Sequence, residues 1–340
     1  MKEFLLNIKR NTKQEKKYLH DIVLSQNERN HKLPRKLFEK FINSIKQQDL
    51  FFYPNTNKVV NKIAKFNFLQ PYNILLTPGS DIGIKTIFET FDIKGKNVIT
   101  SNYFFGMYEV YSQLYQTKLK KAPYTNGKLN IRKIIKLIDK NTKFIILANP
   151  NSPVGDTYNE NEIKLLLETG VHLIIDEAYI ELSNVESFIK YINEYNNLTI
   201  LRTFSKGYGA AGCRVGYLAS NKDNIEYYSK FRLMYEISGI SMKYVEFILD
   251  NHLYFQKYFD DTLKGKKKFY TKLKEKNLQM IDSKSSWFFI KYSQLIEDMF
   301  KKNKISVKVV KHPYDNKNWI KLNYDLSLEK SNILNDLLSI

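Results

Sequence analysis

Short runs of apolar residues recur along the middle of the chain. These runs are rich in Ile, Leu and Val, and they occupy residues 73–77, 97–100, 144–148, 172–175, 199–203 and 214–218. Because apolar and polar residues do not alternate in them, the runs predict strands that are covered on both faces, as in a mostly parallel sheet.

Helical patterns separate these runs. Ile131, Ile134, Ile135 and Ile138 have the spacing i, i+3, i+4, i+7, which places them on one face of a helix. A second helix is predicted over 163–167, before Gly170. Alternating strands and helices predict a three-layer α/β/α domain with a mostly parallel sheet, over residues 36–228.

The pattern changes from about residue 230 onward. Residues 247–276 predict one or two long helices, 286–291 and 319–323 predict strands, and 327–338 predicts a closing helix with a serine at its start. We therefore expect a smaller α+β domain, formed by 229–340 together with an N-terminal arm, 1–35.

Composition excludes several classes of protein. The 340 residues are 43% hydrophobic, which excludes a disordered chain and allows a large core. The net charge of +19 suggests nucleic acid at first, but only seven of the 54 basic residues are Arg. Arg is the residue that reads bases and binds phosphates in bidentate fashion, so we predict a lysine-rich surface with no nucleic-acid partner.

Cysteine and histidine usage argues against a metal site. The single Cys213 excludes an internal disulfide and a zinc cluster built on thiolates, and the five histidines lack metal-ligand spacing. No apolar stretch approaches the roughly 18 residues that would span a bilayer, and the apolar run near the N-terminus is too short for a signal peptide. We expect a cytoplasmic protein with no membrane partner and no metal.

Candidate chemistry follows the predicted strands, at the edge of an open parallel sheet where ligands collect. Each strand is followed by a polar or aromatic segment: Gly79-Ser80-Asp81, Tyr103-Phe104-Phe105, Asn149-Pro150-Asn151-Ser152, Asp176-Glu177-Ala178-Tyr179 and Ser205-Lys206. A helix is predicted to begin near Ser80, and the backbone N–H groups of such an end bind phosphate. Ser205 and Arg214 are suited to complete that phosphate site.

Three of these residues have a characteristic spacing. Lys206 lies in Thr203-Phe204-Ser205-Lys206. Arg214 follows Lys206 by eight residues, and Asp176 precedes Lys206 by thirty residues. This set resembles the fold type I pyridoxal-phosphate aminotransferases of class I and II, in particular the histidinol-phosphate aminotransferase subgroup, which also contains threonine-phosphate decarboxylase. The resemblance runs from Leu24 through LSQNER, TPGSD, FFGMYEVY and NPNSPVG to Asn332.

The resemblance implies a cofactor, pyridoxal 5'-phosphate, and a role for each matching residue. Lys206 would hold the cofactor as a Schiff base, Asp176 would pair with the pyridine nitrogen, and Tyr179 would donate to the phenolic oxygen. The other cofactor-binding residues would be Gly79, Ser80, Asp81, Ser205 and Arg214 at the phosphate, Phe105 on the ring face, and Asn151 or Ser152 near the phenolic oxygen. Tyr53 would reach the phosphate of a neighbouring subunit, which implies a homodimer with shared sites.

Departures from the family pattern concern the substrate side. Ser152 replaces an Asn, Ile82 replaces a Glu, and Lys321 replaces the Arg that would bind a carboxylate or phosphate. A lysine attracts an anion without the bidentate geometry of a guanidinium. We therefore expect transamination between an amino acid donor and a small phosphorylated ketone or amine other than histidinol phosphate. The substrate-side candidates are Asn27, Arg29, Tyr235 and Lys321.

Two alternatives stay open. The same cofactor would support decarboxylation of an O-phospho amino acid, of the threonine- or serine-phosphate type, if the substrate's carboxylate stood perpendicular to the ring. A basic nucleic-acid binder with this fold and no catalysis is disfavoured because the lysine, the aspartate and the arginine are retained. The glycine pattern over 207–212 fits a dinucleotide fingerprint, but a predicted strand follows it instead of a helix, which argues against a dehydrogenase.

Overall fold

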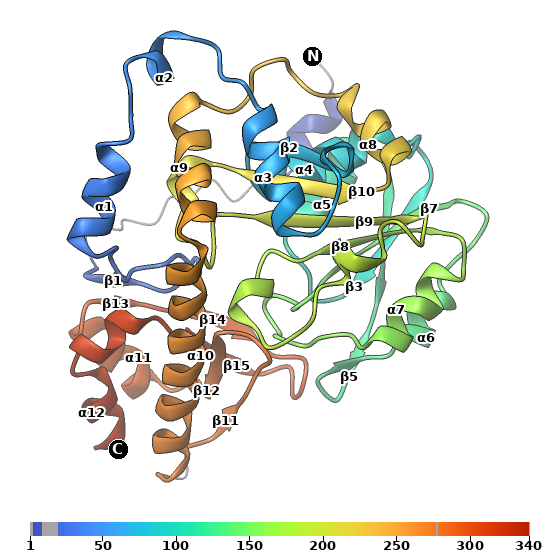
Figure 1. Ribbon diagram of the computed structural model, residues 1–340. Helices are drawn as coiled ribbons and strands as arrows, with labels where there is room; N and C mark the ends of the chain where they lie inside the picture. The colour runs from blue at the N-terminus through green and yellow to red at the C-terminus, as the bar shows by residue number, and fades with distance from the viewer. Residues whose placement is uncertain (1–2, 9–19, 277, 340) are drawn as a thin grey trace.

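A seven-stranded sheet forms the centre of the computed structural model, which describes residues 3–8, 20–276 and 278–339 (Figure 1). The strand order is β2-β10-β9-β8-β7-β3-β4, and β10 is antiparallel to both of its neighbours while the other pairs are parallel. The strands are β2 (Ile74–Thr77), β3 (Asn97–Ser101), β4 (Lys118–Ala122), β7 (Thr142–Ala148), β8 (His172–Asp176), β9 (Leu198–Thr203) and β10 (Gly216–Ser220). The predicted mostly parallel α/β sheet is confirmed.

The sequence-based prediction and the structure differ in a physically informative way at β10 and β4. β10 begins two residues later than predicted, because Arg214 has a left-handed backbone (φ +52°) that a strand does not accommodate. β4 was not predicted, since its lysine-rich sequence lacks an apolar run. β4 is an edge strand, and exposed lysines are typical of edge strands because they oppose pairing with another chain.

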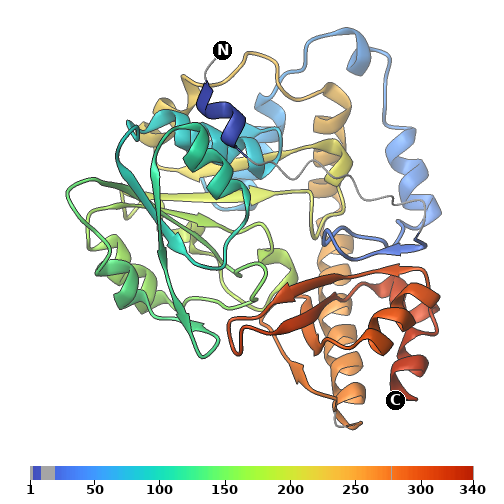
Figure 2. The ribbon, with the colours of Figure 1, turned by 180° about the vertical axis from the view of Figure 1, so that it is seen from behind.

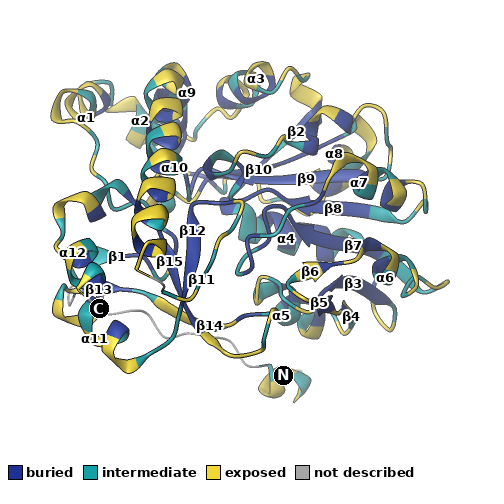
Figure 3. Cartoon of the chain, turned by 90° about the horizontal axis from the view of Figure 1, so that it is seen from below, coloured by how far each residue is buried: buried dark blue, intermediate teal, exposed yellow. Residues whose placement is uncertain are grey.

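Helices cover both faces of the sheet, and its strands other than the edge strand β4 are largely buried (Figure 3). On one face lie α4 (Gly79–Thr90), α5 (Met107–Leu114) and α8 (Lys222–Ser229). On the other lie α3 (Asn57–Phe66), α6 (Ile131–Ile135), α7 (Glu160–Leu167) and α9 (Gly239–Asp250). Successive strand residues point to opposite faces, so Ile145 packs in one core and Ile146 in the other.

A smaller unit follows toward the C-terminus (Figure 2). Its four-stranded antiparallel sheet has the order β11-β12-β15-β14, with α11 (Gln294–Lys302) and α12 (Ile333–Leu338) packed against it. The strands are β11 (Met280–Ile281), β12 (Trp287–Lys291), β14 (Lys308–Lys311) and β15 (Asn318–Asn323). The N-terminal segment joins this unit, because β1 (Ile22–Val23) pairs in parallel with β13 (Ile305–Ser306).

The helix α10 (His252–Lys274) belongs to both cores. Phe255 and Phe259 pack in the core of the large sheet, whereas Phe269 and Leu273 pack in the C-terminal core. The helix α9 lies outside residues 36–228 but also packs against the large sheet. The predicted division into 36–228 and the remainder therefore stays a prediction.

Several shorter elements complete the fold. A small hairpin is formed by β5 (Tyr124–Thr125) and β6 (Lys128–Leu129). The helices α1 (Arg35–Ile42) and α2 (Gln48–Phe51) lie beyond α9, away from the central sheet (Figure 1). The 3-10 turns are η1 (Glu3–Asn7), η3 (Pro71–Asn73), η4 (Ile180–Leu182), η5 (Phe188–Tyr191), η6 (Ala211–Cys213) and η7 (Leu326–Lys330). Over the ranges that the structure describes, none of these helices combines the length and the apolar character needed to cross a bilayer.

Candidate active site

A cavity of about 240 Å³ opens at the carboxyl ends of β7, β8 and β9. This is the edge where ligands bind in open α/β sheets. Its walls bring together residues that lie far apart in the sequence: Ser80, Asp81, Phe105, Ala148, Ser152, Asp176, Ala178, Tyr179, Thr203, Ser205, Lys206 and Arg214.

One end of the cavity is built to receive an anion. Ser80 and Asp81 lie in the first turn of α4, and the Asp81 carboxylate is turned toward α5, where it accepts a hydrogen bond from Tyr111 Oη (3.0 Å). Arg214 Nη1 donates to Ser205 Oγ (3.4 Å) beside this turn. A helix N-terminus, a hydroxyl and a guanidinium together favour a phosphate.

Gly79 allows the guanidinium to reach this end of the cavity. Its φ of +77° lies in the left-handed region, and a Cβ at this position would stand 2.6 Å from Arg214 Nη2. The glycine therefore serves both the turn into α4 and the close approach of Arg214.

Asp176 also lines the cavity and is 5% exposed. Its Oδ2 accepts from Tyr108 Oη (2.8 Å), and its Oδ1 accepts from the backbone N–H of Ala178 (3.1 Å). Burial raises the pKa of the Asp176 carboxyl, and these two hydrogen bonds oppose that rise. Asp176 forms no ion pair within the described ranges, so a cation delivered by a ligand would favour its ionised form.

The N-terminal segment contributes to the site through Gln26 and Asn27. Lys206 Nζ donates to the carbonyl oxygen of Gln26 (2.8 Å), and Asn27 Nδ2 donates to Tyr179 Oη (2.9 Å). Because Asn27 is the donor in its bond, the hydroxyl proton of Tyr179 stays available for a ligand. Asn27 has φ +54°, a backbone conformation that Asn tolerates better than most residues.

Lys321 lies directly behind the cavity wall and is 3% exposed. Its Nζ lies 3.3 Å from Asn27 Oδ1 and 3.4 Å from Ser152 Oγ, and 3.8 Å from the centroid of the Trp287 ring. Burial holds the pKa of the Lys321 amine well below its usual range, and the positive charges of Lys308 and Lys206 lower it further. No carboxylate forms an ion pair with Lys321 in the part of the chain that the structure describes.

Arg29 and Asn151 are among the predicted site residues that do not line the cavity. Arg29 is turned toward α10, with its guanidinium 3.8 Å from the Tyr258 ring centroid and Nη2 donating to Tyr254 Oη (2.9 Å). Asn151 is buried, and its amide donates to the Tyr103 carbonyl (2.8 Å). It is Ser152, and not Asn151, that lines the cavity.

Tyr53 and Tyr235 lie on the surface, outside this cavity. Their rings stack with centroids 4.1 Å apart, and the two residues are 77% and 50% exposed. Phe105 does line the cavity and is also partly open to solvent.

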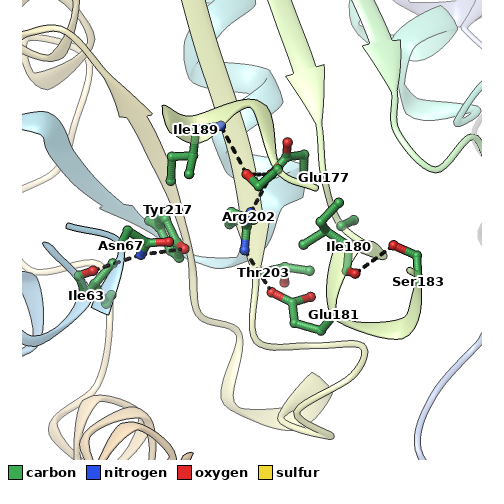
Figure 4. Close-up of polar contacts among 12 residues, drawn as sticks. Ile63, Asn67, Glu177, Ile180, Glu181, Ser183, Ile189, Arg202, Thr203 and Tyr217 are labelled. Carbon is green, nitrogen blue, oxygen red and sulfur yellow. Dashed lines mark hydrogen bonds and ion pairs between the residues drawn. The ribbon is translucent and has the colours of Figure 1, made fainter. Parts of the chain in front are cut away.

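Tyr108, Trp287 and the Gln26 carbonyl were not predicted from the sequence. A buried charged cluster, in which Arg202 lies between Glu177 and Glu181, was not predicted either (Figure 4). The cluster adjoins the turn after Lys206, since a Cβ on Gly207 would stand 3.1 Å from Glu181 Cβ. The sequence shows the Asp176-Glu177 pair and, in the strand before Lys206, Arg202. Only the contacts in the folded protein show that Arg202 forms a cluster with Glu177 and Glu181.

Comparison with known proteins is consistent with this arrangement. Residues 20–336 match the family described as aminotransferase class I and II. The chain belongs to this family. As a class I and II aminotransferase, it has fold type I and is a pyridoxal-phosphate-dependent transaminase, in agreement with the resemblance drawn from the motifs.

The chain is similar to two proteins named histidinol-phosphate aminotransferase and to one named L-threonine-O-3-phosphate decarboxylase. The chain is 34% identical to a histidinol-phosphate aminotransferase of Pyrococcus furiosus over 223 residues, which cover 65% of this chain and 65% of that protein. The histidinol-phosphate aminotransferase of Sinorhizobium meliloti in complex with pyridoxal-5'-phosphate has a TM-score of 0.85 at 16% identity, covering 100% and 95% of the two chains. The L-threonine-O-3-phosphate decarboxylase of Porphyromonas gingivalis has a TM-score of 0.77 at 18% identity, covering 94% and 98%. At such identities the two structures support the fold alone.

The residues of the cavity fit the family's cofactor, pyridoxal 5'-phosphate. The part formed by Ser205, Arg214 and the first turn of α4 suits the phosphate, and Gly79 allows Arg214 to approach it. The buried carboxyl of Asp176, which lines the same cavity, suits a protonated ring nitrogen. The cofactor assignment therefore agrees with the chemistry of the cavity as well as with the family.

Proposed function

We propose that this aminotransferase moves an amino group between an amino acid donor and a small phosphorylated keto substrate, with Lys206 as the catalytic lysine. One observation carries the proposal. The amine of Lys206 lines the same cavity as a buried carboxylate, a phenol with an available proton and an anion-binding helix end. These are the groups that cofactor-dependent transfer of an amine requires.

The chain's own residues would divide the work of holding the cofactor. When bound, the cofactor supplies an electron sink for negative charge at the substrate carbon that bears the amine. Asp176 would hold a proton on the ring nitrogen, and Tyr179 would donate its hydroxyl proton to the phenolic oxygen. Ser80, Ser205, Arg214 and the backbone of Gly79 and Asp81 would bind the phosphate, and Phe105 would cover one face of the ring.

Lys206 would move the proton in the chemical step. A free lysine amine is a compact base, and Nζ would take the proton from the substrate carbon that bears the amine. The hydrogen bond to the Gln26 carbonyl, 2.8 Å long, orients this nitrogen when it is not engaged elsewhere.

The substrate side is proposed to involve Asn27, Ser152 and Lys321. Lys321 Nζ lies 3.4 Å from a hydroxyl of the cavity wall, so it is suited to attract an anionic group of the substrate. Such a group would be a carboxylate or a phosphate, and the name of the relative from Pyrococcus furiosus favours a phosphorylated substrate. Because Arg29 is held against α10, we do not assign it a substrate role.

A homodimer forms part of the proposal. Tyr53 and Tyr235 are exposed and lie outside the cavity of their own chain, which is consistent with a role at the cavity of a second copy. In that arrangement Tyr53 would contact the phosphate bound by the other copy.

A single-turnover experiment tests the reaction. The purified holoenzyme is mixed with phosphorylated amines one at a time, and the visible absorbance of the bound cofactor is followed. We expect one such amine to bleach the absorbance, and an added keto acid to restore it. Lys206→Ala should lose the covalent cofactor band and all turnover. Carbon dioxide release from an O-phospho amino acid, with no 2-oxoglutarate formed from glutamate, would refute transamination and establish decarboxylation.

A further inference from the structure

Glu181 lies in η4, the turn that directly follows Tyr179, and its carboxylate joins this turn to the strand that leads to Lys206. Glu181 Oε1 accepts a hydrogen bond from Arg202 Nη1 (3.2 Å), and Arg202 belongs to β9. The other side of the guanidinium is held by Glu177, to which Arg202 Nε donates (2.7 Å) (Figure 4). Through this pair of bonds, the segment around Tyr179 is attached to β9.

The turn after Lys206 packs directly on Glu181. Gly207 follows Lys206, and a Cβ on Gly207 would stand 3.1 Å from Glu181 Cβ and 3.4 Å from Leu182 Cγ. Carbon atoms in ordinary contact lie about 3.5–4.0 Å apart, so a side chain at position 207 would crowd η4. The turn that carries Glu181 is therefore in contact both with the strand before Lys206 and with the chain after it.

Stability gives no reason for a carboxylate at this position. The Glu181 side chain is 9% exposed, and its Oε2 is buried with no hydrogen-bond partner within the described ranges. Such an oxygen loses its hydration without compensation, and Glu177 already supplies Arg202 with a counter-charge. An apolar side chain of similar size would avoid this cost. The bond to Arg202 is therefore better explained by what it holds in place.

Tyr179 is the residue that this bond would hold. Two other contacts of its side chain come from outside the large sheet: Asn27 Nδ2 donates to Tyr179 Oη (2.9 Å), and the Trp287 ring lies edge-on to the Tyr179 ring, with centroids 5.1 Å apart. Asn27 belongs to the N-terminal segment and Trp287 to the C-terminal unit. The bond between Glu181 and Arg202 instead connects the turn after Tyr179 to the sheet from which Lys206 extends.

We propose that Glu181 is a positioning residue, which through Arg202 holds the Tyr179 hydroxyl where it donates to the phenolic oxygen of the cofactor. This inference rests on the proposed function, because it assumes that Tyr179 is that donor. Its consequence appears in the titration of the bound cofactor. The phenolic oxygen carries a negative charge in the deprotonated form, and a well-placed donor stabilises that charge and lowers the midpoint of the titration.

A pH titration of the cofactor absorbance in the holoenzyme tests the proposal. The matched variants are Glu181→Gln and Glu181→Met, which are both neutral and similar in size, but only glutamine keeps an oxygen that accepts from Arg202. Tyr179→Phe is the reference, and loss of its hydrogen bond to a charged oxygen should raise the midpoint by about one to two pH units. Glu181→Met should titrate at least about half a unit above Glu181→Gln, and it should add no further rise in the Tyr179→Phe background. Removal of the Glu181 charge alone would lower the midpoint, and Glu181→Gln measures that effect.

The reference variant separates this inference from the proposed function. If Tyr179→Phe leaves the midpoint unchanged, Tyr179 is not the donor, and its proposed role and this inference fail together. If Tyr179→Phe raises the midpoint while Glu181→Met and Glu181→Gln titrate alike, the role of Tyr179 stands and positioning by Glu181 is refuted. An equal rise for Glu181→Met with and without the Tyr179 hydroxyl would also refute it, because the effect would not act through Tyr179. Should Glu181→Met fail to fold, Arg202→Lys decides: an ammonium group lacks the planar fork that spans both carboxylates, so the midpoint should rise, and an unchanged midpoint would overturn the proposal.

Discussion

Glu181 should make the stability of this protein fall as pH rises toward neutrality. Two carboxylates share one guanidinium in the buried cluster: Arg202 Nε lies 2.7 Å from Glu177 and Nη1 lies 3.2 Å from Glu181 (Figure 4). Glu177 also accepts from Ser187 Oγ (2.6 Å) and from the backbone N–H of Phe188 (2.8 Å). Glu181 Oε2, in contrast, is buried with no hydrogen-bond partner in the described ranges, so Glu181 is the carboxyl that protonates first.

The size of the effect follows from the pKa of Glu181. Burial raises this pKa to about 7 from its ordinary value of 4.5. A pKa raised in the folded state gives a stabilisation that is complete below the unfolded pKa and is lost as pH rises through the folded pKa. A shift of about 2.5 units corresponds to roughly 3 kcal/mol, lost between about pH 4.5 and pH 7. We treat this as an upper limit, because real burial sites relax around a charge.

The assay compares wild type with Glu181→Gln in urea unfolding, followed by circular dichroism at several pH values. The glutamine variant should match the wild type near pH 5 and gain on it by up to about 3 kcal/mol near pH 7.5, since it has no charge to bury. Glu177→Gln is the matched control. This variant should be less stable than the wild type at both pH values, because the glutamine lacks the charged carboxylate that accepts three hydrogen bonds in the wild type. A difference between wild type and Glu181→Gln that stays constant across this pH range would refute the reasoning.

Two further predictions concern the cofactor. Gly79→Ala should weaken cofactor binding by at least about tenfold in a fluorescence titration of the apoenzyme, because its Cβ would displace Arg214. Gly95→Ala is its control, since Gly95 also has a positive φ (+69°) but nothing lies within 4 Å of its Cβ, so cofactor affinity should not change. Asp176→Asn should reduce turnover by about 100-fold or more while the cofactor still binds, because an amide does not stabilise a protonated ring nitrogen as a carboxylate does. Steady-state rates close to wild type would contradict the role proposed for Asp176.

The sequence was sufficient for the large sheet and for much of the cavity. Strands buried on both faces are apolar throughout, so β7, β8 and β9 could be recognised without their neighbours. Residues that follow such strands converge on one edge of the sheet, which is why Ser80, Asp176, Ser205 and Lys206 could be grouped in advance. Edge strands such as β4 are only partly buried, so no local pattern identified it.

What the sequence determined by itself is therefore the α/β class, the cofactor-binding motifs and the family of this protein. Only the tertiary structure shows which residues surround the proposed substrate side. Lys321 and Asn27 are separated by 294 residues and meet because the N-terminal segment pairs with the C-terminal unit. Arg29, two residues from Asn27, is held instead against α10. Local periodicity indicates which face of a helix or strand is buried. The contacts and the charge state of a buried side chain depend on which distant residues pack against it, and only the tertiary structure determines those neighbours.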